Sequence, residues 1–194
     1  GRVRILDIGA ACGALVKRLR ELGCYAWGVD ISEYALENCC APGFVIRGDV
    51  SGHACIQCGA PKGSRPDTEC PCDLCGAWIC DSHCYEDHVY LNDKIPGRDC
   101  PRVFGSRPRL LPFPDGYFDV VHTNGVWGYF PEADIPRAWA ECRRVGRLQH
   151  HNIDADDDDP THQLLLVRSR AWWDSQFVVK EDSDAGLLVP AANG

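Results

Sequence analysis

Cysteine and histidine side chains crowd into one stretch of the sequence, between Cys55 and His88. Thiolate sulfur and imidazole nitrogen are the ligands that Zn²⁺ prefers, usually four in a tetrahedral site, whereas a disulfide framework needs no histidine. Eight of these residues form four pairs, each with two or three residues between its members, so the sequence predicts two structural zinc ions, the first and third pairs holding one and the second and fourth the other. The leftover Cys70 and His53 could replace a ligand. The expected ligands are Cys55, Cys58, Cys72, Cys75, Cys80, His83, Cys84 and His88.

A second set of chemistry-bearing residues lies at the ends of apolar runs near the start of the chain. Gly9 and Gly13 follow the run RILDI, Asp30 ends AWGVD, and Asp49 ends FVIRGD. Glycine lets a backbone approach a ligand closely, and a carboxylate at the end of a second strand can accept hydrogen bonds from both ribose hydroxyls. Asp49 is placed to meet an adenine edge. The pattern therefore predicts a nucleotide-like ligand at the carboxyl ends of three strands.

These residues need a parallel sheet to bring them together. Apolar runs of strand length alternate with amphipathic helical segments, which is typical of an α/β fold with right-handed crossovers. We expect a Rossmann-like, doubly wound, mostly parallel sheet. Strands are predicted at 2–9, 24–30, 42–50 and 118–122, later strands at 148–153, 163–169, 177–182 and 186–190, and helices at 13–22, 33–39, 134–145 and 169–177.

The alternation stops between residues 51 and 109, where Gly, Pro, Asp and Cys dominate. We therefore predict a core formed by 1–50 and 110–194 and an inserted zinc-binding module at 51–109. The insertion has too few apolar side chains for a core of its own, so metal binding, worth on the order of 10 kcal/mol in such modules, would fold it. Its spacing resembles the B-box-like cross-brace zinc modules.

The outer parts of the chain resemble the class I S-adenosylmethionine-dependent methyltransferases. The resemblance rests on LDIGAACG, GVDIS, GDV, LPFPDGYFDVVHTNGVWGYFP and DIPRAWAECRRV, in that order. It implies that the first turn cradles the methionine part of the cofactor, that Asp30 binds the ribose and that strand three binds the adenine. The implied cofactor-binding residues are Asp7, Gly9, Ala10, Ala11, Gly13, Asp30, Ile31, Asp49, Val50, Asn124 and Gly125. Ala11 stands where the commonest form of the motif has a third glycine; a dehydrogenase is the alternative interpretation of this half.

The resemblance also places the insertion. In the family GDV runs within a few residues into LPFPDG, whereas about sixty residues intervene here. The insertion thus occupies the loop after strand three, on the ligand side of the sheet. We expect it to lie beside or over the active site, with a structural and non-catalytic role for its zinc.

Candidates for proton transfer or acceptor positioning are few. Tyr129 and His151 are the predicted catalytic residues: Tyr129 to position the acceptor, and His151, or its neighbour His150, as a base near the end of strand five. The acidic run 154–159 is interpreted as a solvated turn, with divalent-cation binding as the alternative. Carbon or sulfur acceptors would need no base.

The composition restricts the function further. The net charge of −8 argues against a nucleic-acid backbone as the main partner, and no apolar run is long enough to cross a membrane. Thirteen cysteines together with metal-ligand spacing favour a reducing cytoplasm. The predicted function is methyl transfer from S-adenosylmethionine to a small-molecule acceptor. The alternatives are an RNA or protein methyltransferase whose zinc module recognises the macromolecule, and a non-catalytic S-adenosylmethionine-binding protein.

Overall fold

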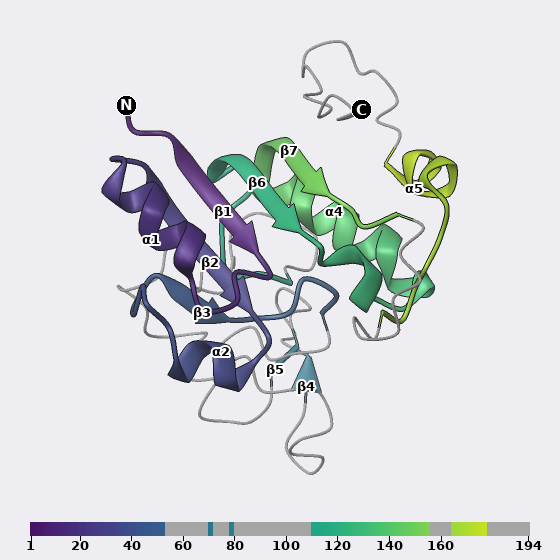
Figure 1. Ribbon diagram of the computed structural model, residues 1–194, viewed down its shortest axis with the longest axis horizontal. Coiled ribbons are helices and arrows are strands. Elements are labelled where there is room, and N and C mark those ends of the chain that lie inside the picture. The colour runs from purple at the N-terminus through teal and green to yellow at the C-terminus, as the bar shows by residue number, and fades with distance from the viewer. Residues whose placement is uncertain (53–69, 72–77, 80–109, 156–163, 178–194) are drawn as a thin grey trace.

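The computed structural model describes residues 1–52, 70–71, 78–79, 110–155 and 164–177. Five parallel strands form one sheet in the order β3-β2-β1-β6-β7 (Figure 1). The crossover at β1, which has β2 on one side and β6 on the other, is the point where ligands bind in open α/β sheets. The strands are β1 (Arg4–Ile8), β2 (Tyr25–Asp30), β3 (Val45–Arg47), β6 (Phe118–Asn124) and β7 (Gly146–Asn152).

Helices cover the two faces of this sheet, as expected of a doubly wound fold. On one face Val16 of α1 (Ala14–Glu21) is buried in a small cluster with Ala26 and Val45. On the other face α4 (Ile135–Val145) buries one side in the larger core. Its buried residues are Ile135, Ala138, Trp139, Glu141, Cys142 and Val145. The helix predicted at 134–145 is therefore confirmed, with its apolar residues at helical spacing.

Shorter elements complete the described chain. Ser32 caps α2 (Glu33–Glu37), and Ser169 caps α5 (Arg170–Gln176), each by accepting a hydrogen bond from a backbone amide three residues on. Two 3₁₀ turns, η1 (Trp127–Tyr129) and η2 (Glu132–Asp134), lead from β6 to α4. A separate antiparallel pair joins β4 (Cys70–Pro71) to β5 (Trp78–Ile79).

One predicted strand is wrong. The segment 164–169 is irregular, because the amides of Leu165 and Leu166 both donate to the carbonyl of Gly128, at 2.8 and 2.9 Å. The segment thus crosses η1 and does not join the sheet. The strands predicted at 177–182 and 186–190 lie almost wholly outside the described residues. Within the described chain, no helix combines the length and apolarity that a membrane span requires.

The two ends of the predicted insertion meet at the core. A Cβ placed on Gly52 would lie 2.7 Å from Cδ2 of Leu110, so the chain leaves and re-enters the core at one point.

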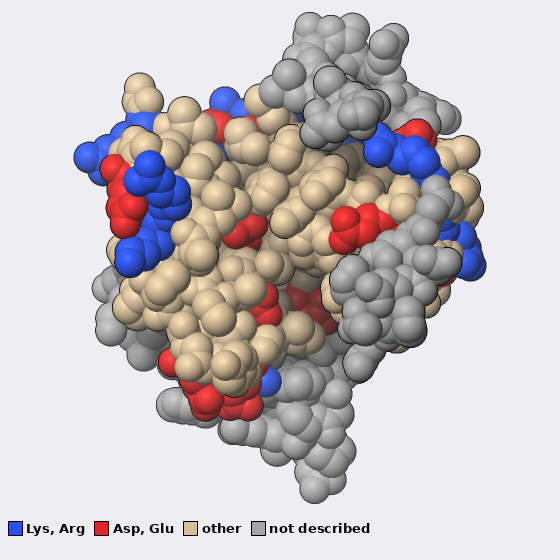
Figure 2. All heavy atoms as spheres, in the orientation of Figure 1, with Lys and Arg blue, Asp and Glu red and all other residues tan. Residues whose placement is uncertain are grey.

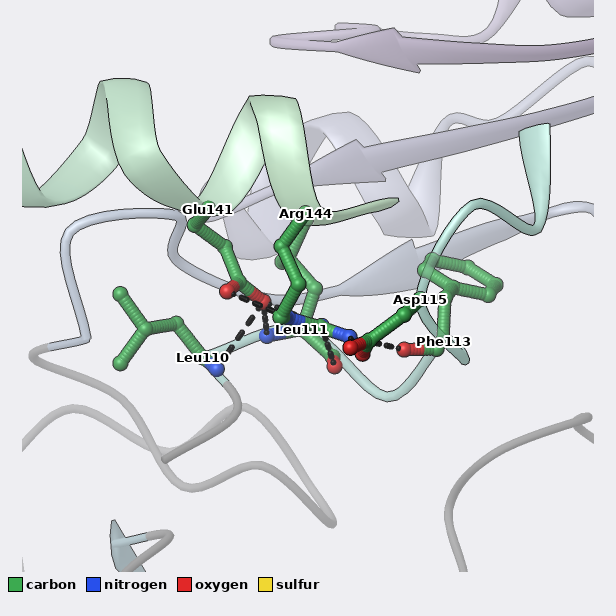
Figure 3. A network of polar contacts seen from close by, with 6 residues as sticks. All are labelled: Leu110, Leu111, Phe113, Asp115, Glu141 and Arg144. Carbon is green, nitrogen blue, oxygen red and sulfur yellow. Dashed lines mark hydrogen bonds and ion pairs between the residues drawn. The ribbon is translucent and has the colours of Figure 1, made fainter. Parts of the chain in front are cut away.

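The returning chain is held there by Glu141 of α4 (Figure 3), whose Oε1 accepts from the amides of Leu110 and Leu111 at 3.0 and 2.7 Å. Arg144 pairs with Glu141 at 2.6 Å and with Asp115 at 2.7 Å. It also donates to the carbonyls of Leu111 and Phe113, so a buried ion pair fixes the segment that leads into β6.

Candidate functional site

A cavity of about 710 Å³ opens at the carboxyl ends of the parallel strands. Figure 2 shows a hollow near the middle of one face, with acidic atoms in and around it and most Lys and Arg atoms nearer the outline. The lining comes from the ends of β1, β2, β3 and β6 and from the segments that follow β6 and β7. It comprises Ile8, Gly9, Val29, Asp30, Ile31, Gly48, Asp49, Val50, Ser51, Asn124, Gly125, Val126, Tyr129, Phe130, Pro131, Asp154 and Leu164.

The turn after β1 brings the backbone to the wall of the cavity. Gly9 has φ +75°, and a Cβ there would collide with Val126. Gly13, the N-cap of α1, has φ +76°, and its Cβ would lie 2.8 Å from Val45, so packing against β3 accounts for this glycine. Ala11 between them has φ +46°, a left-handed conformation that is strained for any residue with a side chain. The turn thus has a left-handed residue at each of the three positions, although the middle one is not a glycine.

The carboxylate of Asp30 is fixed at the end of β2. Its Oδ2 accepts from the amide of Ala11 at 2.7 Å, and its Oδ1 accepts from the amide of Ser32 at 2.8 Å. Each oxygen keeps a second lone pair, and Asp30 lines the cavity. The side chain is therefore preorganised to accept two further hydrogen bonds from a ligand.

Asp7 is the most perturbed carboxylate of the site. Its side chain lies on β1 with 5% exposure, and no hydrogen-bond partner is found for it within the described chain. Burial, and then the negative charge of Asp30, raise the pKa of Asp7 from 3.8 to about 7. A cationic ligand in the neighbouring cavity would favour the ionised form of this group.

The remaining polar groups come from β3 and β6. Oδ1 of Asp49 accepts from the amide and the hydroxyl of Ser51 at 2.7 and 2.6 Å, which holds the chain that follows β3 against the cavity. Asn124 at the end of β6 accepts through its Oδ1 from Asn152 on β7 at 2.7 Å. The ends of β2, β3 and β6 thus each contribute a polar group that hydrogen bonds fix at the same edge of the sheet.

The sequence-predicted cofactor residues fall into two groups. Seven line the cavity: Gly9, Asp30, Ile31, Asp49, Val50, Asn124 and Gly125. The other four, Asp7, Ala10, Ala11 and Gly13, belong to β1 and the turn after it but are not among the lining residues.

The two predicted catalytic residues lie in different environments. Tyr129 lines the cavity and is 51% exposed. His151 instead points into the core between β7 and α4, with its ring 5.3 Å from that of Trp127, 5.2 Å from that of Trp139 and 5.9 Å from that of Phe177. His150, the other candidate, pairs its Nδ1 with that of His122 at 2.8 Å on the opposite face of the sheet.

Both ring nitrogens of His151 already have partners. Nδ1 lies 2.9 Å from the hydroxyl of Thr123, which accepts from the indole N–H of Trp127, and Nε2 lies 3.2 Å from Oε1 of Gln149. Burial, and to a smaller degree the charges of His150 and His122, lower the pKa of His151 to about 3. The geometry therefore gives His151 a neutral, structural place and no access to the cavity.

All eight predicted zinc ligands lie outside the described residues. Among the residues that the structure does describe, no group of three or more His, Cys, Asp or Glu side chains could hold a metal ion. The described strands β4 and β5 stand in the sequence on either side of the pair Cys72 and Cys75. The zinc module thus stays a prediction.

Several lining residues were not predicted from the sequence. Asp154 was interpreted as part of a solvated acidic run, yet its carboxylate lies 2.9 Å from the position of a Cβ on Gly125. Leu164 reaches the wall because its segment crosses η1. The sequence indicated this side of the cavity only through the aromatic residues that follow β6. Of these, Tyr129 and Phe130 line the cavity, whereas Trp127 is buried in the core.

Comparison with known proteins supports the fold. Residues 91–149 match the family model described as a methyltransferase domain. The structure resembles YcgJ of Bacillus subtilis, with a TM-score of 0.50 at 15% identity over 91% of this chain and 60% of that one. It also resembles the Haloferax volcanii complex of the Trm112 methyltransferase activator and a methyltransferase. The TM-score is 0.50 at 12% identity, over 90% of this chain and 59% of that one. A SAM-dependent methyltransferase from Archaeoglobus fulgidus matches with a TM-score of 0.41 at 16% identity, over 76% of this chain and 42% of that one.

The chain therefore spans between about two fifths and three fifths of the length of these solved structures. Curated protein sequences gave no match. Fold and site together define a Rossmann-like α/β domain with a cavity at the carboxyl ends of its parallel strands, and part of this chain matches a methyltransferase domain.

Proposed function

We propose that the chain binds S-adenosylmethionine in this cavity and transfers its methyl group to a small acceptor. The observation that carries the proposal is the convergence of four strand ends on one cavity, with a close backbone approach at Gly9 and a preorganised carboxylate at Asp30. The carboxylate of Asp7 next to it is buried and has no hydrogen-bond partner among the described residues. These features fit an adenosyl ligand that carries positive charge.

The residues of the cavity divide among the parts of that ligand. Asp30 would accept hydrogen bonds from the ribose hydroxyls, and Asp49 with Val50 would contact the adenine. The turn Gly9–Gly13, together with Asn124 and Gly125, would hold the methionine part, with Asp7 favouring its positive charge. The bound cofactor supplies an activated methyl group on a sulfonium; the protein positions the acceptor and receives a proton where the acceptor has one to lose.

Tyr129 is the group that we propose to position the acceptor. It lines the cavity beside Phe130 and exposes half of its side chain. We give no role in proton transfer to His151, because both of its nitrogens are used inside the core. His150 receives no role either, because it lies on the opposite face of the sheet and does not line the cavity.

Binding and turnover are tested separately. We expect isothermal titration calorimetry to detect binding of S-adenosylmethionine and of S-adenosylhomocysteine. Asp30→Asn should lower the affinity for both by about tenfold or more, because a hydrogen bond to a charged acceptor is worth roughly 1.5–3 kcal/mol. The control is Asp174→Asn, because Asp174 pairs with Arg170 on the surface of α5. No affinity in the unmodified protein would refute the proposal, and affinity without formation of S-adenosylhomocysteine from any acceptor would leave a non-catalytic binding protein.

A zinc-folded insertion is the second part of the proposal. The support is the ligand spacing between Cys55 and His88 and the meeting of the insertion's two ends at Gly52 and Leu110. Cys12, Cys24, Cys39, Cys40 and Cys142 are free thiols in the described chain, in keeping with the reducing, cytoplasmic compartment expected from the sequence. We expect elemental analysis of the purified chain to give two zinc ions; a chain without transition metal would refute this part.

The partner that we propose is a small molecule, because the described lining contains no Lys or Arg to bind phosphates. The Haloferax volcanii methyltransferase of similar fold is described in complex with an activator protein. Size-exclusion chromatography with mass measurement would therefore detect a protein partner that co-purifies. Salt-sensitive binding to bulk RNA would favour the alternative of a macromolecular acceptor.

A further inference from the structure

The cavity has a second part that the cofactor does not need. Gly9, Asp30 and Asp49 belong to the ends of β1, β2 and β3, where the proposed function places the adenosyl ligand. The remaining lining comes from the other half of the sheet, after β6 and β7. This acceptor part comprises Tyr129, Phe130, Pro131, Leu164 and Asp154, and the proposed function gives a role only to Tyr129.

One wall of this acceptor part is apolar and aromatic. Tyr129 and Phe130 follow β6, and their backbone amides are fixed by hydrogen bonds to the carbonyls of Val126 and Trp127, at 3.1 and 3.3 Å. Leu164 completes the wall, because the two amides that follow it donate to the carbonyl of Gly128. A wall of two aromatic rings and a leucine on a fixed backbone suits a flat apolar ligand.

The opposite polar group is Asp154. One of its carboxylate oxygens lies 2.9 Å from the position that a Cβ on Gly125 would occupy, so the side chain stands directly over the turn that ends β6. Within the described chain this carboxylate has neither a hydrogen bond nor an ion pair, in contrast to Asp30 and Asp49. None of the described lining residues is Lys, Arg or His. An acceptor with a carboxylate or phosphate would meet only negative charge here.

From these contacts we propose, on the basis of the proposed function, that the acceptor is a small protonated amine that carries an aromatic or heteroaromatic ring, and that Asp154 determines this specificity. The ring packs against Tyr129, Phe130 and Leu164, and the amine faces Asp154. In the transfer the nitrogen lone pair forms a bond to the methyl carbon while the carbon–sulfur bond breaks and its electron pair stays on sulfur. Before this step Asp154 receives one proton from the bound ammonium and passes it to water, which frees the lone pair. The methylated amine then leaves as an ammonium.

The test uses three probes of similar shape that differ in charge: 2-phenylethylamine, 2-phenylethanol and 3-phenylpropanoate. Binding of each to the full, metal-loaded chain saturated with S-adenosylhomocysteine is measured by ligand-observed NMR. We expect the amine to bind better than the alcohol, and the alcohol better than the carboxylate, with about tenfold between the extremes for one partly exposed charge. Asp154→Asn should remove this order, and Asp154→Lys should reverse it.

Two controls separate this proposal from the proposed function. Asp174→Asn removes a distant surface charge and should leave the order of the probes unchanged. Titration with S-adenosylhomocysteine should still detect binding to Asp154→Asn, which shows that the cofactor part of the cavity is intact when the probes are compared. If the protein does not bind the cofactor, the proposed function fails. If it binds the cofactor but none of the probes, prefers the carboxylate, or keeps its preference in Asp154→Asn, the amine proposal is overturned.

Discussion

Replacement of Asp7 by Asn tests whether the site holds a carboxylate that the fold disfavours. The pKa of Asp7 is raised from 3.8 to about 7 by burial and by Asp30, so this group ionises in the unfolded chain before it ionises in the folded one. Because the folded chain binds this proton more tightly, Asp7 does not destabilise the fold below about pH 4. The free energy of unfolding then falls as the pH rises from 4 to 7. One pKa unit corresponds to about 1.4 kcal/mol, so the loss amounts to about 4 kcal/mol in total, of which about 3 kcal/mol falls between pH 5 and pH 8.

Asp7→Asn should therefore be more stable than the unmodified protein at pH 8. An unpaired buried amide costs about 1–3 kcal/mol, which leaves a net gain of roughly 2 kcal/mol. Urea unfolding at pH 5 and pH 8 measures it. The relevant quantity is the difference between variant and unmodified protein, because His122 and His151, whose pKa values are lowered, lose stability in the opposite direction as the pH falls.

The matched control is Asp119→Asn. Hydrogen bonds from Arg4 lower the pKa of Asp119, so its effect on stability should be the same at pH 5 and pH 8. The Asp7 variant should also bind S-adenosylmethionine more weakly, because it cannot supply the negative charge. A stability difference for Asp7→Asn that does not change with pH would refute the reasoning.

Four further changes have defined outcomes. Glu141→Ala should lower the free energy of unfolding in urea by about 3 kcal/mol, because the amides of Leu110 and Leu111 lose their acceptor and Arg144 loses its buried carboxylate partner. Gly9→Ala should abolish cofactor binding by calorimetry, whereas Gly23→Ala, with φ +89° and open space around it, should cost only about 1 kcal/mol of backbone strain. Ala11→Gly should relieve a similar strain and raise Tm by several degrees. His151→Leu should change stability but not the pH profile of methyl transfer; a lost basic limb would contradict its structural place.

The strand ends were predictable from the sequence because one periodic signal determines both the fold and the site. Apolar runs that end in Gly9, Asp30 and Asp49 give the strands, and parallel strands bring their carboxyl ends to one edge. The fold class and the lining residues Gly9, Asp30 and Asp49 followed from that rule, whereas Ile31, Val50, Asn124 and Gly125 followed from the resemblance to the methyltransferases. Ala11 shows its limit, since the backbone keeps a left-handed conformation without the glycine that would signal it.

The acceptor side was less predictable because it depends on contacts between distant segments. Neighbouring residues of a strand point to opposite faces, and the sequence did not show that His151 faces α4 while His150 faces away. The run around Leu165 has the composition of a strand. In the structure it pairs with no strand of the sheet, because its amides donate two hydrogen bonds to the carbonyl of Gly128. Asp154 was likewise predicted to be solvated because its neighbours in the sequence are acidic. Its contact with Gly125, twenty-nine residues away in the chain, has no signal in the sequence.

The contact between Gly52 and Leu110 has a consequence for how the domain is put together. A short glycine-serine linker can join these two residues in place of 53–109 without stretching the sheet, so core and insertion become separable thermodynamic units. Closing a loop of that length costs roughly 2 kcal/mol more chain entropy than closing a four-residue one, if the loop is a flexible coil. The shortened protein would gain that amount over a parent whose insertion is unfolded, and much less over a parent whose insertion brings its own ends together.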